Sequence, residues 1–226
     1  ALRRLRELRK REIEFTLSQT GSSVFKFGAP QRAAHLKWSD AMGLPAAVGL
    51  TVEQYLGWEA RQPDKHEYVS GEVVAMVGVT RKHATVAGNV FNLVTTHLGD
   101  GPCRAYMSDV KLRVEAANAF YYPDVFVTCD SRDHQADDFM SSAVLVVEVL
   151  SPSTAAYDRG EKFAAYRKLA GLREYVLIDP DRRRIEYFRR GEGDLWVLHE
   201  PGPDRSLTLQ SVDLRIASED VFRRVD

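Results

Sequence analysis

The sequence predicts an α/β protein built around a mixed β-sheet, and the order of its elements leads to this fold class. Apolar residues recur at three- and four-residue steps over residues 82–98, which is the spacing of an amphipathic helix. Three β-prone segments, a second helix and a further strand follow in that order, at residues 104–114, 120–129, 143–150, 155–170 and 173–180. The sheet must be mixed, because the second helix carries the chain across to a new strand.

Local signals place the remaining elements. Thr51 is a suitable N-cap for a short helix at the start of the domain, and Ser70 and Gly71 between two β-prone runs predict a hairpin. Hydroxyl residues at 151–154 provide caps for the second helix, and Gly171 is placed to end it. A Gly-Glu-Gly-Asp turn at 191–194 joins two later strands into a meander. The prediction is therefore an α/β core with added β-hairpins.

The composition is that of one globular domain with a substantial core. The chain has 226 residues, of which 44% are hydrophobic and 28% charged, and its 31 basic and 32 acidic side chains give a formal net charge of −1. These values exclude a disordered or fibrous protein and a uniformly basic nucleic-acid coat. No apolar run approaches the roughly 20 residues that cross a bilayer. The basic N-terminus leads into no secretory signal, so we expect a cytoplasmic protein without a membrane segment.

The domain is expected to cover residues 50–226, after a basic appendage at residues 1–49 that is helical and then irregular. The appendage is either an arm that touches nucleic acid, a solvated charged helix or an upstream extension. Cys103 and Cys129 form no Cys-x-x-Cys motif or ligand cluster, so we expect neither a structural zinc site nor a disulfide framework. Both cysteines are expected to be core residues.

Two acidic residues lie in segments that are otherwise apolar. Glu148 occurs in the run 143–150, which is apolar enough to be buried on both faces, and Asp124 lies in the aromatic and β-branched strand before it. A buried carboxylate needs a cation, a hydrogen-bond network, a metal or a proton held through a raised pKa. If the two converge, their repulsion favours a divalent cation, and oxygen ligands suit Mg²⁺ or Mn²⁺ better than zinc. The alternative for either acid is a structural ion pair.

The helix after the Glu148 strand carries a second group of candidates. Asp158 and Lys162 are four residues apart, and Tyr166 is one turn further along the same stripe. One interpretation is an exposed ion pair that contributes about 0.3 kcal/mol. The other places the Lys162 ammonium over the two carboxylates, where it would orient water or stabilise negative charge on a phosphate.

Several motifs in a fixed order resemble a known family. They are PDV at 123–125, VEVLSPST at 147–154, YDRGEKFAAYRKL at 157–169 and EYVLIDP at 174–180, together with the opening TVEQYL and HEYVSGEVV segments. With these motifs the chain resembles the Uma family of restriction-endonuclease-like proteins, which belongs to the PD-(D/E)xK nuclease superfamily. The resemblance covers roughly residues 50–221.

The resemblance implies a restriction-endonuclease-like core of helix, three strands, helix and strand. In this core Asp124 and Glu148 match the two acidic metal ligands of the superfamily. The implied activity is Mg²⁺-dependent (or Mn²⁺-dependent) hydrolysis of phosphodiester bonds.

Two departures from the superfamily pattern affect the assignment. Leu150 stands where the strand motif usually has lysine, so Lys162 on the following helix is the matching candidate for the lysine role. The helix at 82–98 contains no acidic residue, so Glu67 in the hairpin is expected to supply the further metal-binding carboxylate.

Other residues match the family pattern in auxiliary positions. His83, at the start of the first core helix, is expected either to bind phosphate or water near the metal or to be structural. Asp109 is expected either to support a metal ligand from outside or to lie in a turn or on the surface. Asp158 and Tyr166 complete the auxiliary set.

The sequence therefore predicts a Mg²⁺-dependent endonuclease that acts on DNA, with RNA as the alternative substrate; its catalytic residues are Asp124, Glu148, Lys162 and Glu67. The competing hypothesis is a catalytically silent nucleic-acid or protein-binding module that keeps the scaffold after losing the strand lysine. Basic clusters would either position a phosphate backbone or form solvated surface, at residues 182–184, 189–190 and 223–224. A homodimer is expected, because nucleases that cut duplexes often use two sites.

Overall fold

The computed structural model describes residues 23–25, 46–76, 78–202 and 205–226. In these residues the largest unit is a seven-stranded sheet with the order β1-β12-β11-β10-β9-β7-β4. The strands β9 and β10 are parallel, and the other neighbours are antiparallel, which confirms the predicted mixed sheet. The bounds along the chain are β1 Ser23–Phe25, β4 Arg104–Met107, β7 Val125–Thr128, β9 Leu145–Val149, β10 Glu174–Asp179, β11 Arg184–Arg190 and β12 Trp196–His199.

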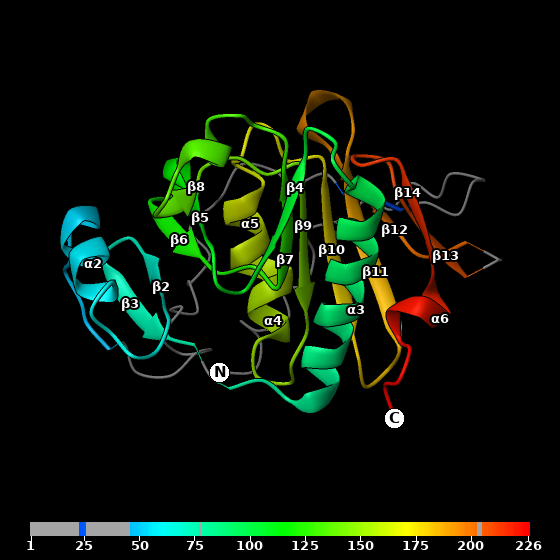
Figure 1. Cartoon of the computed structure of the whole chain (residues 1–226), viewed down its shortest axis with the longest axis horizontal. Helices are drawn as coiled ribbons and strands as arrows, with labels where there is room; N and C mark the ends of the chain where they lie inside the picture. The colour runs from blue at the N-terminus through cyan, green and yellow to red at the C-terminus, as the bar shows by residue number, and fades with distance from the viewer. Residues whose placement is uncertain (1–22, 26–45, 77, 203–204) are drawn as a thin grey trace, which may run out of the picture.

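A five-stranded sheet and a two-stranded hairpin accompany the main sheet in the described residues (Figure 1). The five-stranded sheet has the order β3-β2-β6-β5-β8 and contains β2 His66–Val69, β3 Glu72–Ala75, β5 Lys111–Val114, β6 Ala119–Tyr121 and β8 Phe139–Met140. The hairpin consists of β13 Ser206–Leu209 and β14 Leu214–Ala217. Short 3-10 turns occupy Glu115–Ala117, Asp133–Gln135 and Glu192–Asp194.

Helices cover both faces of the seven-stranded sheet. α3 Arg81–Leu98 and α6 Ser218–Val221 lie on one face, and α4 Ala155–Tyr157 and α5 Phe163–Tyr166 lie on the other, with a π-helical turn Asp158–Lys162 between α4 and α5. The helix α2 Val52–Glu59 packs against the five-stranded sheet instead. Alternate residues of β9 point to opposite faces. Val147 and Val149 pack with the α3 side, whereas Val146 and Leu150 pack with the aromatic residues of α5. No helix in the described ranges is long and apolar enough to cross a membrane.

The local signals at the start of the domain are confirmed. Thr51 is the N-cap of α2, in a reciprocal capping box with Gln54. Ser70 and Gly71 form the turn of the β2–β3 hairpin with φ values of 51° and 98°. Most of the predicted appendage at residues 1–49 lies outside the described residues, but β1 pairs with β12 at the edge of the seven-stranded sheet.

Two predicted strands are each divided between the two large sheets. The segment 104–114 turns after Met107, so β4 enters the seven-stranded sheet and β5 enters the five-stranded one. The segment 120–129 changes sheets at Pro123, between β6 and β7. Proline has no N–H group and cannot continue a ladder of hydrogen bonds, which is the physical reason for the break.

The predicted continuous helix at 155–170 is wrong in its interior and at its end. Its middle is the π-helical turn, and regular helix ends at Tyr166 rather than at Gly171. The Arg190 guanidinium takes over the role expected of glycine, because it donates to the carbonyl oxygens of Arg167, Leu169 and Ala170.

The expectation that the cysteines form no disulfide is also wrong, because Cys103 and Cys129 form one. Both are partly buried against the apolar core on the α3 side, in agreement with their expected packing. They continue the antiparallel register of β4 and β7, where Arg104 pairs with Thr128, so the two residues lie opposite each other. Their separation of 26 residues carries no spacing signal. Only the strand register, which the sequence does not show, brings them together.

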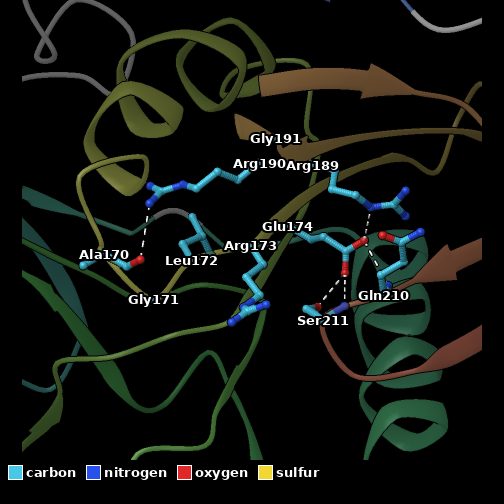
Figure 2. A pocket seen from close by; sticks show the side chains of 10 residues that line it. All are labelled: Ala170, Gly171, Leu172, Arg173, Glu174, Arg189, Arg190, Gly191, Gln210 and Ser211. Carbon is cyan, nitrogen blue, oxygen red and sulfur yellow. Dashed lines mark hydrogen bonds and ion pairs between the residues drawn. The ribbon is translucent and has the colours of Figure 1, made fainter. Parts of the chain in front are cut away.

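A pocket of about 340 Å³ lies at the N-terminal end of β10, and its polar groups serve the fold (Figure 2). The buried Glu174 carboxylate accepts hydrogen bonds from the N–H groups of Gln210 and Ser211, from the Ser211 hydroxyl and from Arg189 Nε. Figure 2 shows Glu174 turned toward this loop and Arg190 turned toward Ala170. Glu174 therefore attaches the β13–β14 loop to the main sheet.

Replacing Glu174 with Ala is expected to lower the free energy of unfolding by about 3 kcal/mol, because the Arg189 cation and two N–H groups lose their buried acceptor. Urea unfolding measures this loss. The exposed Glu192, changed to Ala, is the matched control and should alter stability by less than about 0.5 kcal/mol. A comparable effect in both variants would contradict the assigned anchoring role.

Candidate metal and catalytic site

Asp124 and Glu148 converge at the junction of β7 and β9. Asp124 immediately precedes β7, and Glu148 lies near the end of β9, which is the antiparallel neighbour of β7. The Val149 N–H donates to Asp124 Oδ2 at 2.7 Å, and the Asp124 N–H approaches Glu148 Oε2 at 3.5 Å. The two residues are only 8% and 4% exposed. The predicted pair of buried acids is thus brought together by adjacent strands.

Lys162 lies among carboxylates rather than on the surface. Its ammonium is 2.9 Å from Glu67 Oε1, 3.0 Å from Glu148 Oε1 and 4.0 Å from Asp158 Oδ1. The residue is buried, as are its three acidic neighbours. The interpretation of Asp158 and Lys162 as an exposed ion pair is therefore wrong, and the interpretation that placed Lys162 over the carboxylates agrees with the geometry.

The position of Lys162 follows from the alternation of side chains along β9. Glu148 and Leu150 lie on the face that packs against α4 and α5, and Leu150 is part of the apolar core there. The π-helical turn above this face presents Lys162 to Glu148. π-helical turns inside helices are frequent at functional sites. A lysine from the helix therefore occupies the neighbourhood that a lysine at position 150 would have reached from the strand.

Glu67 and His83 each have one side-chain atom that forms a hydrogen bond or close polar contact and one buried atom that has no such partner in the described residues. Glu67 Oε1 accepts from the Tyr122 N–H at 3.3 Å, and His83 Nε2 is 2.9 Å from Asp124 Oδ1. Their other side-chain atoms, Glu67 Oε2 and His83 Nδ1, are buried without a hydrogen-bond partner in the described part of the chain. Unpartnered buried polar atoms indicate a place for a ligand, an ion or water. Thr80 caps the N-terminus of α3 and fixes the start of the helix that carries His83.

A cavity of about 210 Å³ opens onto this cluster. Its wall includes all the acids named above together with Lys162 and His83, and the loop 151–154 that follows β9. Tyr166 lies behind the wall and donates from its hydroxyl to Glu148 Oε1 at 2.9 Å. It thereby fixes the orientation of the carboxylate. The charged side chains thus face a space that a small part of a substrate could enter.

Asp109 is the one sequence candidate that lies elsewhere. It occupies the turn after β4, its side chain is 78% exposed, and it forms an ion pair with Lys65. It lies outside the cavity wall. Of the two roles considered for Asp109, the geometry corresponds to the turn and surface role.

The cluster has an excess of acidic groups. If Glu67, Asp124, Glu148 and Asp158 were all ionised, four negative charges would face the single positive charge of Lys162, a net charge of −3 with His83 neutral. Burial raises the pKa of the Glu148 carboxyl to about 8, the Lys162 ammonium opposes this rise, and Asp124 adds to it. Burial likewise raises the pKa of Asp158 to about 6.

The surroundings of Lys162 favour its charged form, whereas those of Glu148 favour the neutral form. Burial alone would lower the pKa of its ammonium, but the carboxylates of Glu148, Glu67 and Asp158 raise that pKa well above its ordinary value. Lys162 therefore carries a positive charge throughout the physiological range. The remaining negative charge must be compensated by protons or by a further cation.

The donor set fits a hard divalent cation. Asp124 and Glu148 offer carboxylate oxygens side by side, and the excess negative charge favours a cation with two charges. The described residues hold no ready-made group of three or more His, Cys, Asp and Glu side chains around one point. Mg²⁺ usually binds through one or two carboxylates and takes its other ligands from water and phosphate, so two carboxylates are sufficient.

A mixed sheet with helices on both faces is the architecture of a restriction-endonuclease-like protein, and here Lys162 of the π-helical turn lies beside the acids of two adjacent strands. The sequence matches the Uma2 family, described as "Putative restriction endonuclease", over residues 52–217. The chain belongs to this family. The resemblance predicted from the motifs is thereby confirmed.

Two relatives and one solved structure are also similar to the chain. Two uncharacterized proteins of Synechocystis sp. are similar: slr1290 is 39% identical over 175 residues, 77% of this chain and 92% of the relative, and sll1609 is 31% identical over 153 residues, 67% and 86%. The fold is also similar to a crystal structure described as a "putative nuclease belonging to DUF820" from Anabaena variabilis. The TM-score is 0.64 at 20% identity, covering 78% of this chain and 99% of that one.

Two parts of the site were not foreseen from the sequence. Tyr122 lines the cavity and donates its N–H to Glu67, and the Val149 N–H holds Asp124. Tyr122 stands two residues before Asp124, so its place in the aromatic run was a usable signal. The Val149 contact has no such signal, because it involves only the backbone.

The binding of Mg²⁺ is expected to depend on pH. As a metal ligand Glu148 would have to be a carboxylate, whereas its raised pKa of about 8 keeps a proton on it at lower pH. Apparent Mg²⁺ affinity should therefore rise up to roughly tenfold per pH unit below pH 8 and level off above it. Calorimetry at pH 6, 7, 8 and 9, in buffers with different heats of ionisation, measures both the affinity and the released proton. An affinity independent of pH in this range would contradict the assignment.

Replacing Lys162 with Met is expected to lower the free energy of unfolding by about 3 kcal/mol in the metal-free protein, because buried carboxylates lose their cation. The exposed Lys168, changed to Met on the same segment, provides the control and should cost less than about 0.5 kcal/mol. Unfolding in urea with EDTA compares the two. An equally stable Lys162→Met protein would mean that the ammonium is not required to hold the acids together.

Proposed function

We propose that this protein is a divalent-metal-dependent nuclease that hydrolyses phosphodiester bonds, with DNA as its substrate. The observation that carries the proposal is the meeting of Asp124, Glu148 and Lys162 at the wall of one cavity. Membership of the family and the nuclease-like fold support it. Fold alone does not determine function, so the assignment depends on these side chains.

Each residue of the cluster has a distinct task in the proposed reaction. Asp124 and Glu148 would hold Mg²⁺ or Mn²⁺, with Glu67 as a further carboxylate at the same cavity. The bound cation would supply Lewis acidity, which activates water and polarises the scissile phosphate. Lys162 provides a fixed positive charge for the additional negative charge that develops on the phosphate during attack.

The surrounding groups hold this arrangement in place. Tyr166 fixes one oxygen of Glu148, and the Val149 N–H fixes one oxygen of Asp124. His83 bonds to the other oxygen of Asp124 and keeps its free Nδ1 atom at the cavity, where it would contact water or a phosphate oxygen. Groups that are already fixed in place need little reorganisation when charge develops in the reaction, so they stabilise that charge at low cost.

The alternative is a binding module without catalytic activity. The observation that favours it is Leu150, which replaces the strand lysine by a core residue. The position of Lys162 weakens this alternative, because an ammonium already lies 3.0 Å from Glu148. A silent module would bind nucleic acid without turnover in the presence of Mg²⁺ or Mn²⁺.

Replacing Asp124 or Glu148 with Ala is expected to reduce Mg²⁺-dependent cleavage of plasmid and single-stranded DNA by at least about 10³-fold, because the cation loses a carboxylate ligand. Asp109→Asn is the matched control, since this acid is exposed and lies outside the cavity wall. It should keep full activity. Circular dichroism and calorimetry with Mg²⁺ establish that each variant is folded and report its metal binding.

The result separates the two hypotheses. Cleavage that survives in both alanine variants would remove these acids from the catalytic assignment. An intact protein that binds metal and DNA but cuts neither DNA nor RNA would instead establish the silent binding module.

A further inference from the structure

A surface that carries a cluster of arginines among acidic residues adjoins the candidate site at the same end of the sheet. The strands β9 and β10 are parallel, and Leu177 of β10 pairs with Glu148, so the turn after β10 lies beside the end of β9. This turn contains Arg182 and Arg183. The start of α3 also reaches it, because Lys82 forms an ion pair of 3.2 Å with Asp181. Figure 1 shows this turn and the start of α3 at the lower end of the molecule.

Shared lining residues make the catalytic cavity a neighbour of this surface. Ser151 and Pro152 line the cavity on one side and, on the other, a second pocket of about 350 Å³. Arg182 lines this second pocket and also a third, larger hollow of about 740 Å³. We define these two hollows together as the arginine groove. The groove therefore begins at the rim of the cavity and continues past the β10–β11 turn.

Most arginines of the groove are held in fixed positions. Arg159 donates two hydrogen bonds to Glu186, Arg184 pairs with Glu200 at 2.6 Å, and Arg183 donates to the Val225 carbonyl. The groove thus has a preformed shape. The turn itself is fixed by a carboxylate oxygen that accepts from two successive N–H groups, Asp179 Oδ1 from Asp181 and Arg182.

Arg182 and Arg205 are exposed arginines of the groove. The Arg182 side chain is 79% exposed and 3.7 Å from the nearest carboxylate oxygen, that of Asp179. Arg205 is exposed, lines the larger hollow and directly precedes β13. An exposed guanidinium presents two parallel N–H groups that match the oxygens of a phosphate. Arg182 and Arg205 thus give one hollow two exposed guanidinium groups that could each bind a phosphate.

The arginines at the other end of the sheet bind groups of the protein itself, unlike the exposed arginines of the groove. Arg189 is bound to Glu174 and to the Thr208 carbonyl, and Arg190 is bound to three carbonyl groups at the end of α5. Figure 2 shows them directed toward these partners. Of the basic clusters in the sequence, the one at 182–184 is therefore suited to an external anion, and the one at 189–190 serves the fold.

We propose that the arginine groove binds the phosphate backbone of a polynucleotide strand whose adjoining phosphodiester lies in the catalytic cavity. The proposal rests on the proposed nuclease function for the position of the cleaved bond. The groove would hold the strand through its phosphates, by charge and without reading its bases.

Binding of fluorescein-labelled DNA tests the proposal on the full chain in EDTA, where no cleavage occurs. The variant is Arg182→Gln/Arg205→Gln, and the probes are a 20-nucleotide single strand and a 20-base-pair duplex, measured by anisotropy at several salt concentrations. We expect an affinity at least tenfold weaker for whichever form the groove holds. The slope of log K against log[salt] should become shallower by about 2, because two phosphate contacts are lost. The exposed Arg173, at the opposite end of the sheet, provides the control Arg173→Gln and should bind like the unaltered protein.

The outcomes are decisive for the groove. Unchanged affinity and slope of the double variant on both probes, with thermal unfolding confirming its fold, would overturn the proposal. An equal loss in Arg173→Gln would also overturn it, since binding would then follow total charge. A loss with the single strand only would assign the groove to an unpaired strand, and a loss with the duplex to one strand of a double helix.

A separate measurement tests the nuclease function without the groove. The intact protein and Asp124→Ala are compared on bis(p-nitrophenyl) phosphate with Mn²⁺, a phosphodiester too small to span the groove. Hydrolysis by the intact protein together with unchanged DNA binding in the double variant would reject the groove and keep the nuclease. Absence of hydrolysis together with weakened DNA binding would reject the nuclease and support the groove.

Discussion

The architecture around the site depends on the buried ion pairs of the Lys162 ammonium. This ammonium is in contact with Glu67 of the five-stranded sheet and with Glu148 of the seven-stranded sheet, and it comes from the helical segment between β9 and β10. Removing a charge from water is costly unless its partners are in place. The two sheets and the helix must therefore adopt their relative positions together, since each supplies one member of a charge network that is unfavourable when incomplete.

The same network has an excess of acidic groups, whose negative charge protons or a bound cation must compensate. One ammonium cannot balance four acids, and the raised pKa values of Glu148 and Asp158 show that burial makes additional negative charge unfavourable. Protons can neutralise these groups, but a divalent cation does so while leaving the carboxylates ionised. The feature that lowers the stability of the metal-free cluster is thus the feature that makes it suited to bind a metal.

Patterns that repeat along the chain were sufficient to predict most of the fold. The helix α3, the β2–β3 hairpin and the mixed sheet follow from periodicity and turn residues, and the acids Asp124 and Glu148 were identifiable because apolar strands do not normally contain them. The sequence could not show contacts that depend on strand register, of which the disulfide Cys103–Cys129 is the clearest. It could not show the π-helical turn either, because that turn depends on packing against the sheet.

The helix-borne lysine has a structural consequence that a lysine on the strand would not have. A side chain at position 150 would be fixed by the sheet itself, whereas Lys162 is only as well placed as the helix that carries it. Two contacts of Tyr175 in β10 hold the helix. Phe163 stacks on Tyr175 with 4.8 Å between the ring centroids, and the Tyr175 hydroxyl donates to the Asp158 carbonyl at the start of the π-helical turn. The geometry of the ion cluster therefore depends on aromatic contacts of Phe163 and Tyr175, neither of which lines the cavity.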